Sequence, residues 1–262
     1  MSDVDQHNRL ELGLRGMTAV VIGSGPGIGA ATIELLVAAG CRVVAADLDL
    51  QIARKAAAGY GDSVVPAAVD VTNRESVRDL FAEVTSNEGA PSTVVDVVGI
   101  ARPKSVADTT DEDWDVMQQL NLRQQFVVSQ EAARVLARPG SYVAVASING
   151  VVSSPMNAAY GAGKAGLVSL VRSLALELAP DDIRINAVAP GIVGTPRLNA
   201  FFESSGKRGA FEDAVPMGRL ATPADIAGAI VWLASPLAAY VTGQVISVDG
   251  GATVKYPLAL MA

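Results

Sequence analysis

The chain has 262 residues, of which 50% are hydrophobic. This length is typical of one α/β domain with a large core rather than of two small domains. The net charge of -7 argues against a nucleic-acid partner and against an acidic membrane surface, because phosphate groups are bound by clustered Lys and Arg. We expect one globular domain whose partners include neither.

Two scarce residue types limit the sites that the chain can form. Cys41 is the only cysteine, which excludes an intrachain disulfide. His7 is the only histidine, which excludes an ordinary His/Cys zinc cluster. No metal site is therefore expected.

The N-terminal segment shows no export signal, because residues 1–16 are charged and lack the apolar run of a signal peptide. Residues 17–40 are nearly uncharged, but Glu34 and the Gly-Pro-Gly break at 25–27 argue for a strand, a turn and a helix rather than a membrane span. We expect a cytoplasmic protein with a polar tail over residues 1–13 and one domain over residues 14–262.

Short β-branched runs alternate with helical segments along the whole chain. This pattern predicts an α/β fold with a seven-stranded parallel sheet and helices on both faces. The predicted strands lie at 17–23, 41–47, 63–70, 92–99, 141–147, 183–190 and 243–250, and the predicted helices at 29–40, 73–89, 111–137 and 160–180. Thr110 and Asp113 are expected to form a capping box at the start of the third helix. Residues 197–215 lose the periodicity and are expected to form a mobile loop near a site.

A glycine-rich turn follows the first predicted strand. Gly23, Gly27 and Gly29 form the pattern G-x-x-x-G-x-G, which differs from the common G-x-G-x-x-G fingerprint. Glycine lets phosphates approach the backbone closely, and the start of a helix favours their negative charge. Asp47 ends the second strand 24 residues after Gly23, where a carboxylate can accept hydrogen bonds from an adenosine ribose and repel a 2′-phosphate.

A second motif lies at the start of the fourth predicted helix. Tyr160 and Lys164 are four residues apart, so they share one helix face and can act on one ligand. A nearby ammonium lowers the pKa of a tyrosine, which is about 10 when unperturbed. Ser147 ends the fifth strand, thirteen residues before Tyr160.

These motifs together resemble the short-chain dehydrogenase/reductase family over about residues 14–255. The resemblance implies a single-domain Rossmann-type doubly wound fold and an NAD-dependent oxidoreductase that transfers a hydride between NAD(H) and a secondary alcohol or ketone. It implies that Tyr160 is the acid or base and that Ser147 binds the substrate oxygen. It also implies that Lys164 lowers the Tyr160 pKa and holds the nicotinamide ribose, and that Asn121 holds a water that relays the proton. The implied cofactor-binding residues are Gly23, Gly27, Ile28, Gly29, Asp47, Leu48, Asp70, Val71, Gly99, Tyr160, Lys164, Pro190, Gly191, Val193 and Thr195.

The chain departs from the family pattern at several positions. Ile22 stands where the family usually has Thr, and Ala146 where it often has a second serine. Pro26 stands where members that use the phosphorylated cofactor often carry a basic residue. Pro26 and Asp47 therefore both favour NAD over NADP as the cofactor. Residues 96–99 read Asp-Val-Val-Gly instead of Asn-Asn-Ala-Gly, and the sequence alone does not show what replaces the two asparagines.

The substrate is expected to be a hydrophobic small molecule. The walls of its site are assigned to Ile148, Met156, Asn157, Phe201 and Phe202, with Phe211 and Met217 on the same loop over residues 195–217. Lys207 and Arg208 leave open a 3-oxoacyl-thioester reductase, although such reductases usually use NADPH. A non-catalytic NAD sensor on the same fold is a further alternative. The apolar C-terminal residues favour a homotetramer or homodimer with that tail at an interface.

Overall fold

Seven parallel strands form one sheet in the order β3-β2-β1-β4-β5-β6-β7 in the computed structural model, which describes residues 11–254. This confirms the predicted seven-stranded parallel sheet. The strands are β1 (Thr18–Ile22), β2 (Arg42–Asp47), β3 (Val64–Ala68), β4 (Thr93–Asp96), β5 (Gly140–Val145), β6 (Ile183–Pro190) and β7 (Val245–Val248). The N-terminal tail up to residue 10 and the apolar residues 255–262 lie outside the described residues.

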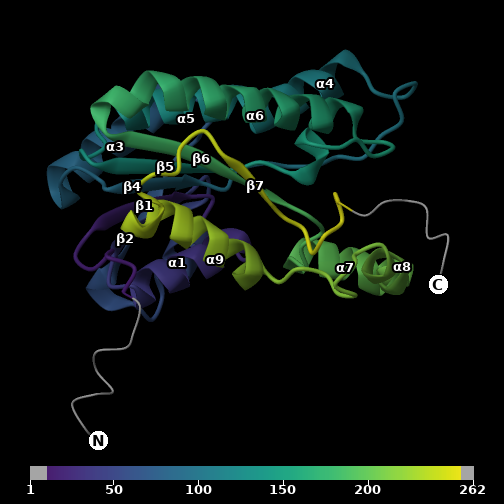
Figure 1. Cartoon of the computed structure of the whole chain (residues 1–262), viewed down its shortest axis with the longest axis horizontal. Helices are drawn as coiled ribbons and strands as arrows, with labels where there is room; N and C mark the ends of the chain where they lie inside the picture. Colours follow the sequence, from purple (N-terminus) through teal and green to yellow (C-terminus); the bar gives the residue numbers. More distant parts are fainter. Residues whose placement is uncertain (1–10, 255–262) are drawn as a thin grey trace, which may run out of the picture.

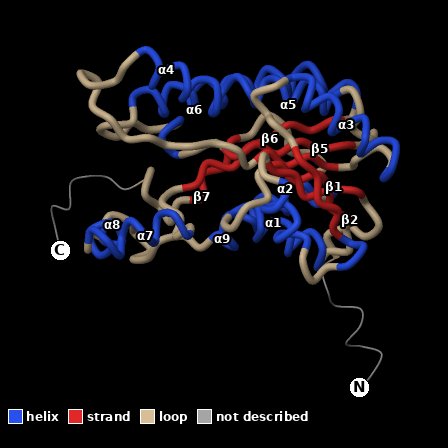
Figure 2. The backbone as a smooth tube through the Cα atoms, turned by 180° about the vertical axis from the view of Figure 1, so that it is seen from behind, coloured by secondary structure: helices blue, strands red, loops and turns tan. Residues whose placement is uncertain are grey.

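Helices cover both faces of the sheet (Figure 1). They are α1 (Ile28–Ala38), α2 (Leu50–Ala57), α3 (Arg74–Glu88), α4 (Asp111–Gln118), α5 (Gln124–Ala133), α6 (Ala158–Leu178), α7 (Pro196–Ser205), α8 (Arg208–Asp213) and α9 (Pro223–Ala234). One layer holds α3, α5 and α6, and the other holds α1 and α9, as Figure 2 also shows from behind. Each layer closes its own apolar core against the sheet, with Phe81 and Leu167 in one core and Ile33 and Ile230 in the other. Within residues 11–254 no helix has the length and apolarity needed to cross a membrane.

Three helical regions differ from the prediction. The expected loop over 197–215 is wrong, because Thr195 caps α7, Pro196 occupies its first turn, and α8 follows. The helices α2 and α9 were not predicted. Helix α9 has few polar residues, and six of its twelve residues are buried. Its sequence therefore shows no clear alternation of polar and apolar residues at helical spacing.

The predicted helix at 111–137 exists, but it is not regular. Thr110 and Asp113 form the expected capping box at the start of α4. A π-helical turn, Gln119–Arg123, then separates α4 from α5 and contains the buried Asn121. Such wide turns occur often at functional sites because they re-aim one side chain within a helix.

A buried carboxylate links α5 to its neighbours. Glu131 is 3% exposed and pairs with Arg74, Arg134 and Arg78, with N–O distances of 2.8, 3.1 and 3.6 Å. Burial raises the pKa of Glu131, but the hydrogen bond from Arg74 and the charges of Arg134 and Arg78 outweigh it, so the pKa lies below its usual value. This ion pair ties α3 to α5.

The order of the strands determines where a ligand can bind. The chain builds outward from β1 on one side and from β4 on the other, so the strand order reverses between these two neighbours. In open parallel sheets ligands bind at this switch point, beyond the carboxyl ends of the strands. Gly23 follows β1 directly and Asp96 ends β4, so both lie at that point.

Candidate active site

The glycine turn lies between β1 and α1 and depends on glycine for two separate reasons. Gly23 and Gly27 have φ values of +87° and +140°, which other residues rarely adopt. A Cβ on Gly29 would lie 2.0 Å from the Gly23 carbonyl oxygen, so a side chain there would collide with the backbone. The turn thus brings the start of α1 to the switch point, where the partial positive charge of a helix terminus favours an anion.

Asp47 fastens this turn to the end of β2. Its Oδ2 accepts a hydrogen bond of 3.1 Å from the Gly25 amide. This bond holds Gly25 in place. The same carboxylate borders the cleft described next.

A cleft of about 430 Å³ opens over the switch point. Ten of the fifteen predicted cofactor-binding residues border it: Gly23, Gly27, Ile28, Gly29, Asp47, Leu48, Asp70, Val71, Gly99 and Thr195. Asp70 also forms a turn after β3, since its Oδ1 accepts bonds from the Thr72 amide and hydroxyl. Residues from four separate strand ends and from the turn before α7 thus meet around one cleft.

The segment after β6 closes the cleft only in part. The position of a Cβ on Gly27 would be 3.6 Å from Thr195 Cγ2, so the two residues face each other. Pro190, Gly191 and Val193 do not border the cleft. Gly191 packs against Asp249, and Val193 is 8% exposed and forms a bridge with Ala221.

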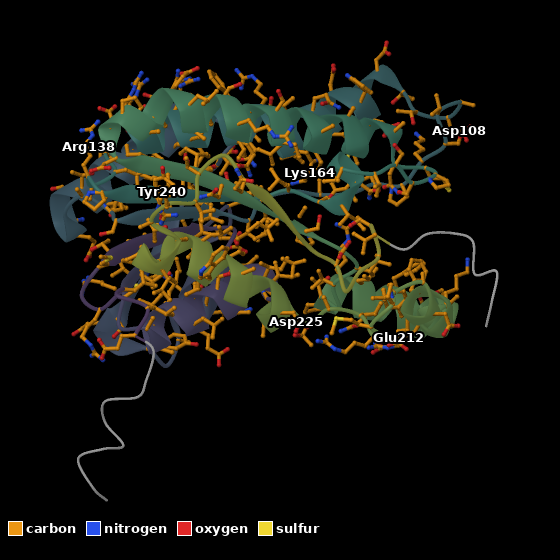
Figure 3. The ribbon with its side chains drawn as sticks, viewed as in Figure 1. Asp108, Arg138, Lys164, Glu212, Asp225 and Tyr240 are labelled. Carbon is orange, nitrogen blue, oxygen red and sulfur yellow. The ribbon has the colours of Figure 1, made fainter. Side chains whose placement is uncertain are left out.

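Ser147, Tyr160 and Lys164 come together where β5 and α6 meet. Ser147 follows β5, and its Oγ accepts a bond from the Asn149 amide. Tyr160 and Lys164 lie in the first two turns of α6, with the Lys164 Nζ 5.9 Å from the centre of the Tyr160 ring. That Nζ donates a 2.7 Å bond to the Val145 carbonyl. Figure 3 shows Lys164 deep inside the molecule, whereas Asp108 and Glu212 lie on two projections beyond the sheet.

Burial dominates the electrostatics of these three side chains. It raises the pKa of Tyr160, and a hydrogen bond from Ser147 only partly offsets this. It lowers the pKa of Lys164 to about 8, against the opposing charge of Asp96. The pKa of Tyr160 thus lies above its usual value rather than below it as expected, because loss of water around the phenol has the larger effect.

Asn121 and Gly99 complete the inner end of the site. The Asn121 amide donates to the Ile100 and Met117 carbonyls, and its oxygen accepts from the Ile100 amide. A Cβ on Gly99 would lie 2.9 Å from Lys164 Nζ and 3.0 Å from the Asn121 oxygen. Glycine at position 99 thus lets the loop after β4 approach the lysine.

The five predicted substrate residues lie in two different environments. Met156 is 54% exposed, has a φ of +63°, and its carbonyl accepts from the Lys104 amide, which ties segment 148–157 to the loop after β4. Ile148 and Asn157 belong to the same segment. Phe201 is 44% exposed, but Phe202 is 3% exposed and packs against Phe211 at 5.1 Å between ring centres.

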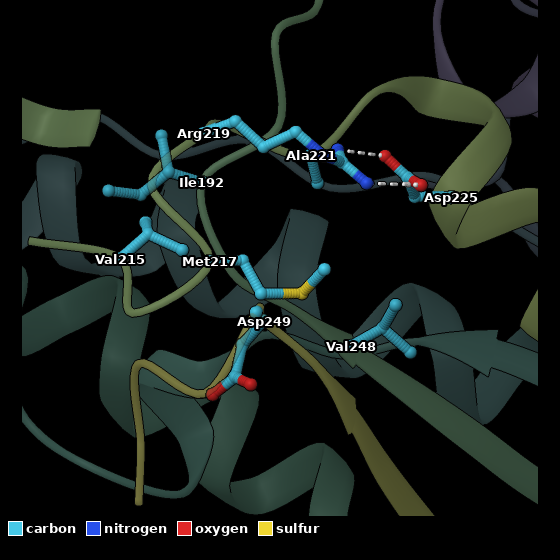
Figure 4. Close-up of a pocket in the computed structure, with 9 residues that line it drawn as sticks. Ile192, Val215, Met217, Arg219, Ala221, Asp225, Val248 and Asp249 are labelled. Atoms are coloured by element: carbon cyan, nitrogen blue, oxygen red, sulfur yellow. Dashed lines mark hydrogen bonds and ion pairs between the residues drawn. The ribbon is translucent and has the colours of Figure 1, made fainter. Parts of the chain in front are cut away.

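A smaller cavity of about 180 Å³ lies between the end of β7 and the loop after α8 (Figure 4). Met217, Val248 and Asp249 line it, and the ion pair between Arg219 and Asp225 closes one side. None of the predicted catalytic residues borders it. Among residues 11–254, no three His, Cys, Asp or Glu side chains gather closely enough to hold a metal.

The carboxyl group of Asp96, at the carboxyl end of β4, was not assigned a role from the sequence. Asp96 was noted there only as a departure from the family pattern, but it is fully buried and its charge acts on Lys164. The signal for it was a carboxylate at the end of an otherwise apolar strand, where an ionisable group needs a partner.

The fold and the site together define a doubly wound α/β protein with a turn of the kind that binds dinucleotides. A family model described as enoyl-(acyl carrier protein) reductase matches residues 23–253. The chain is 35% identical to the 3-oxoacyl-[acyl-carrier-protein] reductase FabG of Thermotoga maritima, over 91% of this chain and 98% of that protein. It is 36% identical to a tropinone reductase homolog of Arabidopsis thaliana, over 92% of each chain.

A solved structure agrees with these sequence matches. The crystal structure of gox2181 is 35% identical and superimposes with a TM-score of 0.89, over 94% of this chain and 98% of that one. The chain therefore belongs to the short-chain dehydrogenase/reductase family. It is an oxidoreductase of that family, which acts on CH-OH or keto groups with a nicotinamide cofactor.

Proposed function

We propose that the protein interconverts a secondary alcohol and a ketone with NAD(H) as its cofactor. The observation that carries this proposal is the meeting of Ser147, Tyr160 and Lys164 beside Gly99, which borders the cleft together with the glycine turn and Asp47. A hydroxyl, a half-buried phenol and a buried ammonium in one group suit the transfer of a proton to or from a substrate oxygen.

The described residues fit a dinucleotide. The turn at Gly23, Gly27 and Gly29 would hold the pyrophosphate, because its backbone can be approached closely and the start of α1 favours negative charge. Asp47 would accept from the adenosine ribose, and Thr195 would contact the nicotinamide end. The nicotinamide, when bound, would accept or supply the hydride.

The side chains of the chain itself would manage the proton. Because burial raises the pKa of Tyr160, its phenol is protonated at neutral pH in the free protein, which is the form that donates to a ketone. Ser147 would hydrogen-bond the substrate oxygen where negative charge develops. Lys164 would stabilise the phenolate that remains after the proton has left, and Asn121 would fix the loop after β4 beside it.

The substrate would enter between segment 148–157 and α7. The exposed Met156 and Phe201 supply apolar surface there, which suits a hydrophobic small molecule. Ile148 and Asn157 would lie along the same wall. Phe202 is packed against Phe211 and would support the wall rather than touch the substrate.

A 3-oxoacyl-thioester reductase is the second candidate, favoured by the similarity to 3-oxoacyl-[acyl-carrier-protein] reductase FabG. Lys207 or Arg208 would then meet the carrier. Arg208, however, already pairs with Glu212 at 2.9 Å and bonds to Asn199, which leaves it less available. A non-catalytic NAD sensor would leave the group of Ser147, Tyr160 and Lys164 without a use.

A substrate panel tests these candidates. NADH oxidation is followed with ketones and 3-oxoacyl thioesters, and NAD reduction with secondary alcohols, in the native protein and in Y160F. We expect turnover of a hydrophobic ketone or alcohol, and a loss of at least about 100-fold in Y160F with NADH binding retained. Turnover of thioesters alone would establish the second candidate. Tight NADH binding with no turnover of any compound would favour a sensor.

We also propose that the protein forms a homodimer or homotetramer. Exposed apolar side chains support this, since Leu176 on α6 is 81% exposed and Tyr240 is fully exposed. Sedimentation equilibrium measures the state directly, and a monomer at micromolar concentration would refute the proposal.

A further inference from the structure

Asp96 is a carboxyl group placed at the centre of the sheet. It is the last residue of β4, pairs in register with Ile22 of β1 and Ala144 of β5, and has no exposed surface. Its Oδ1 accepts a 2.9 Å bond from the Val98 amide. Burying an ionised carboxylate is unfavourable unless other groups compensate its charge, so the groups around Asp96 determine whether it is ionised.

The first partner is the hydroxyl of Tyr142, which lies between two acceptors. It is 3.3 Å from Asp96 Oδ2 and 2.9 Å from Gln125 Oε1, yet a hydroxyl has one proton and can donate to only one of them. The Gln125 Nε2 is buried and has no hydrogen-bond partner. The two orientations of the Gln125 amide therefore correspond to two proton arrangements.

Both arrangements satisfy the Tyr142 hydroxyl. With the amide oxygen toward Tyr142, a protonated Asp96 donates to the hydroxyl, which donates to Gln125. With the amide rotated, Gln125 donates to the hydroxyl, which donates to an ionised Asp96. Rotating one amide thus lets Asp96 gain or lose a proton without leaving a hydroxyl unsatisfied.

The second group that acts on Asp96 is Lys164, whose charge reaches the carboxyl group without a direct hydrogen bond. Its Nζ bonds to the carbonyl of Val145, which follows the register partner of Asp96 on β5. Burial raises the pKa of Asp96 to about 7 and lowers that of Lys164 to about 8, and the attraction between the two charges opposes both effects.

The other elements packed around Asp96 add little charge. The titratable groups that face Asp96 and Lys164 are Tyr142 from β5 and Tyr160 from α6. The neighbouring residues of α5 are the uncharged Gln124 and Gln125, and that of β1 is Ile22. Asp96 is thus the negative charge that acts on the buried ammonium of Lys164.

We propose that Asp96 is a positioning residue for the oxidoreductase reaction: its buried carboxylate keeps the ammonium of Lys164 charged beside Tyr160. This inference rests on the proposed function for its consequence in catalysis, but the coupling between the two groups does not depend on turnover. Asp96 itself touches neither substrate nor cofactor.

The variant D96N tests the coupling with little change of shape, and it restores the asparagine that the family pattern has at this position. Without the negative charge, the pKa of Lys164 is expected to fall by about one unit, because burial then acts without opposition. At pH 7.5 a fall from about 8 to about 7 reduces the charged fraction of Lys164 about threefold. The alkaline limb of kcat against pH moves to lower pH by the same amount.

The pKa of Lys164 is measured by NMR on protein labelled with 13C at the lysine Cε, without cofactor or substrate. The chain has only five lysines, and K164M identifies the signal by its loss. The control D115N removes the same charge from the exposed surface of α4 and is expected to leave the pKa of Lys164 unchanged. A change below about 0.2 unit in D96N, or an equal change in D115N, would overturn the proposal.

The native protein provides a second measurement if D96N does not fold. Two coupled groups titrate together, so the Lys164 signal should shift in two steps, the first where Asp96 ionises near pH 7. A single step at the pH of Lys164 alone would contradict the coupling. If the two steps occur but no alcohol or ketone is turned over, the proposed function fails while the coupling stands.

Discussion

Replacing Asp47 by asparagine isolates the charge that we expect to select NAD over NADP. The Asp47 carboxylate borders the cleft and accepts from the Gly25 amide at 3.1 Å. Asparagine has nearly the same shape, and its side-chain oxygen can accept the same bond. D47N therefore removes one negative charge while the glycine turn keeps its anchor.

The size of the effect follows from the repulsion between this carboxylate and a 2′-phosphate. Two unit charges about 6 Å apart repel by about 1.4 to 2.8 kcal/mol at an effective dielectric constant of about 40 to 20. The phosphate carries more than one charge near pH 7, while salt and water in the open cleft reduce the repulsion. We expect the ratio of kcat/KM for NAD to that for NADP to fall about 10- to 100-fold in D47N.

The assay is steady-state turnover with both cofactors at saturating substrate, followed at 340 nm. D49N is the matched control, since exposed Asp49 lies two residues on and caps α2 by accepting from the Gln51 amide at 2.8 Å. Asparagine caps a helix as well as aspartate does, so D49N changes only the net charge. If D47N and D49N alter the ratio by the same factor, or if the native protein uses both cofactors equally, the role of Asp47 is refuted.

Three further outcomes test the packing of the fold. G29A should weaken NADH binding at least about tenfold and lower the melting temperature, because its Cβ would meet the Gly23 carbonyl oxygen at 2.0 Å. The control G25A places its Cβ at ordinary contact distance and should fold normally. Calorimetry and NADH fluorescence compare the two variants, and equal behaviour would contradict the steric argument. E131Q should reduce the free energy of unfolding by about 1 kcal/mol at pH 7, since it removes the carboxylate that pairs with three partly exposed arginines. Because the pKa of Glu131 is lowered on folding, this loss should shrink as the pH falls below about 4, and urea titrations at both pH values check the sign. Burial raises the pKa of Cys41 to about 11, so an alkylating reagent at pH 8 should label this thiol only in the unfolded chain. Rapid labelling of the folded protein would contradict the burial of the thiol.

The elements predicted correctly are those whose signals are local. Each strand is a short β-branched run, and parallel strands are buried on both faces, so a continuous apolar run identifies them. The glycine turn was predictable because its spacing reflects a steric need that the structure confirms at Gly29. The spacing of Tyr160 and Lys164 similarly reflects one turn of α6.

The features missed from the sequence depend on distant partners. The consequence of a carboxylate at Asp96 depends on Tyr142, 46 residues away, and on Lys164, on a different element. Its role therefore appears only after β4, β5 and α6 have packed together. The anchoring of Gly25 by Asp47, across 22 residues, was missed for the same reason.

The two adjacent phenylalanines on α7 show how one wrong assignment of local structure affects a functional interpretation. As parts of a loop, Phe201 and Phe202 could both face a substrate. On a helix, successive side chains point about 100° apart, so one face cannot hold both. Both rings contact Phe211 of α8, at 5.1 Å for Phe202 and 6.5 Å for Phe201 between ring centres, but Phe202 is 3% exposed whereas Phe201 is 44% exposed, so only the ring of Phe201 keeps an accessible face. Truncating Phe202 should thus act on the stability of this helical pair, and truncating Phe201 on KM, because only the latter ring is free to meet a ligand.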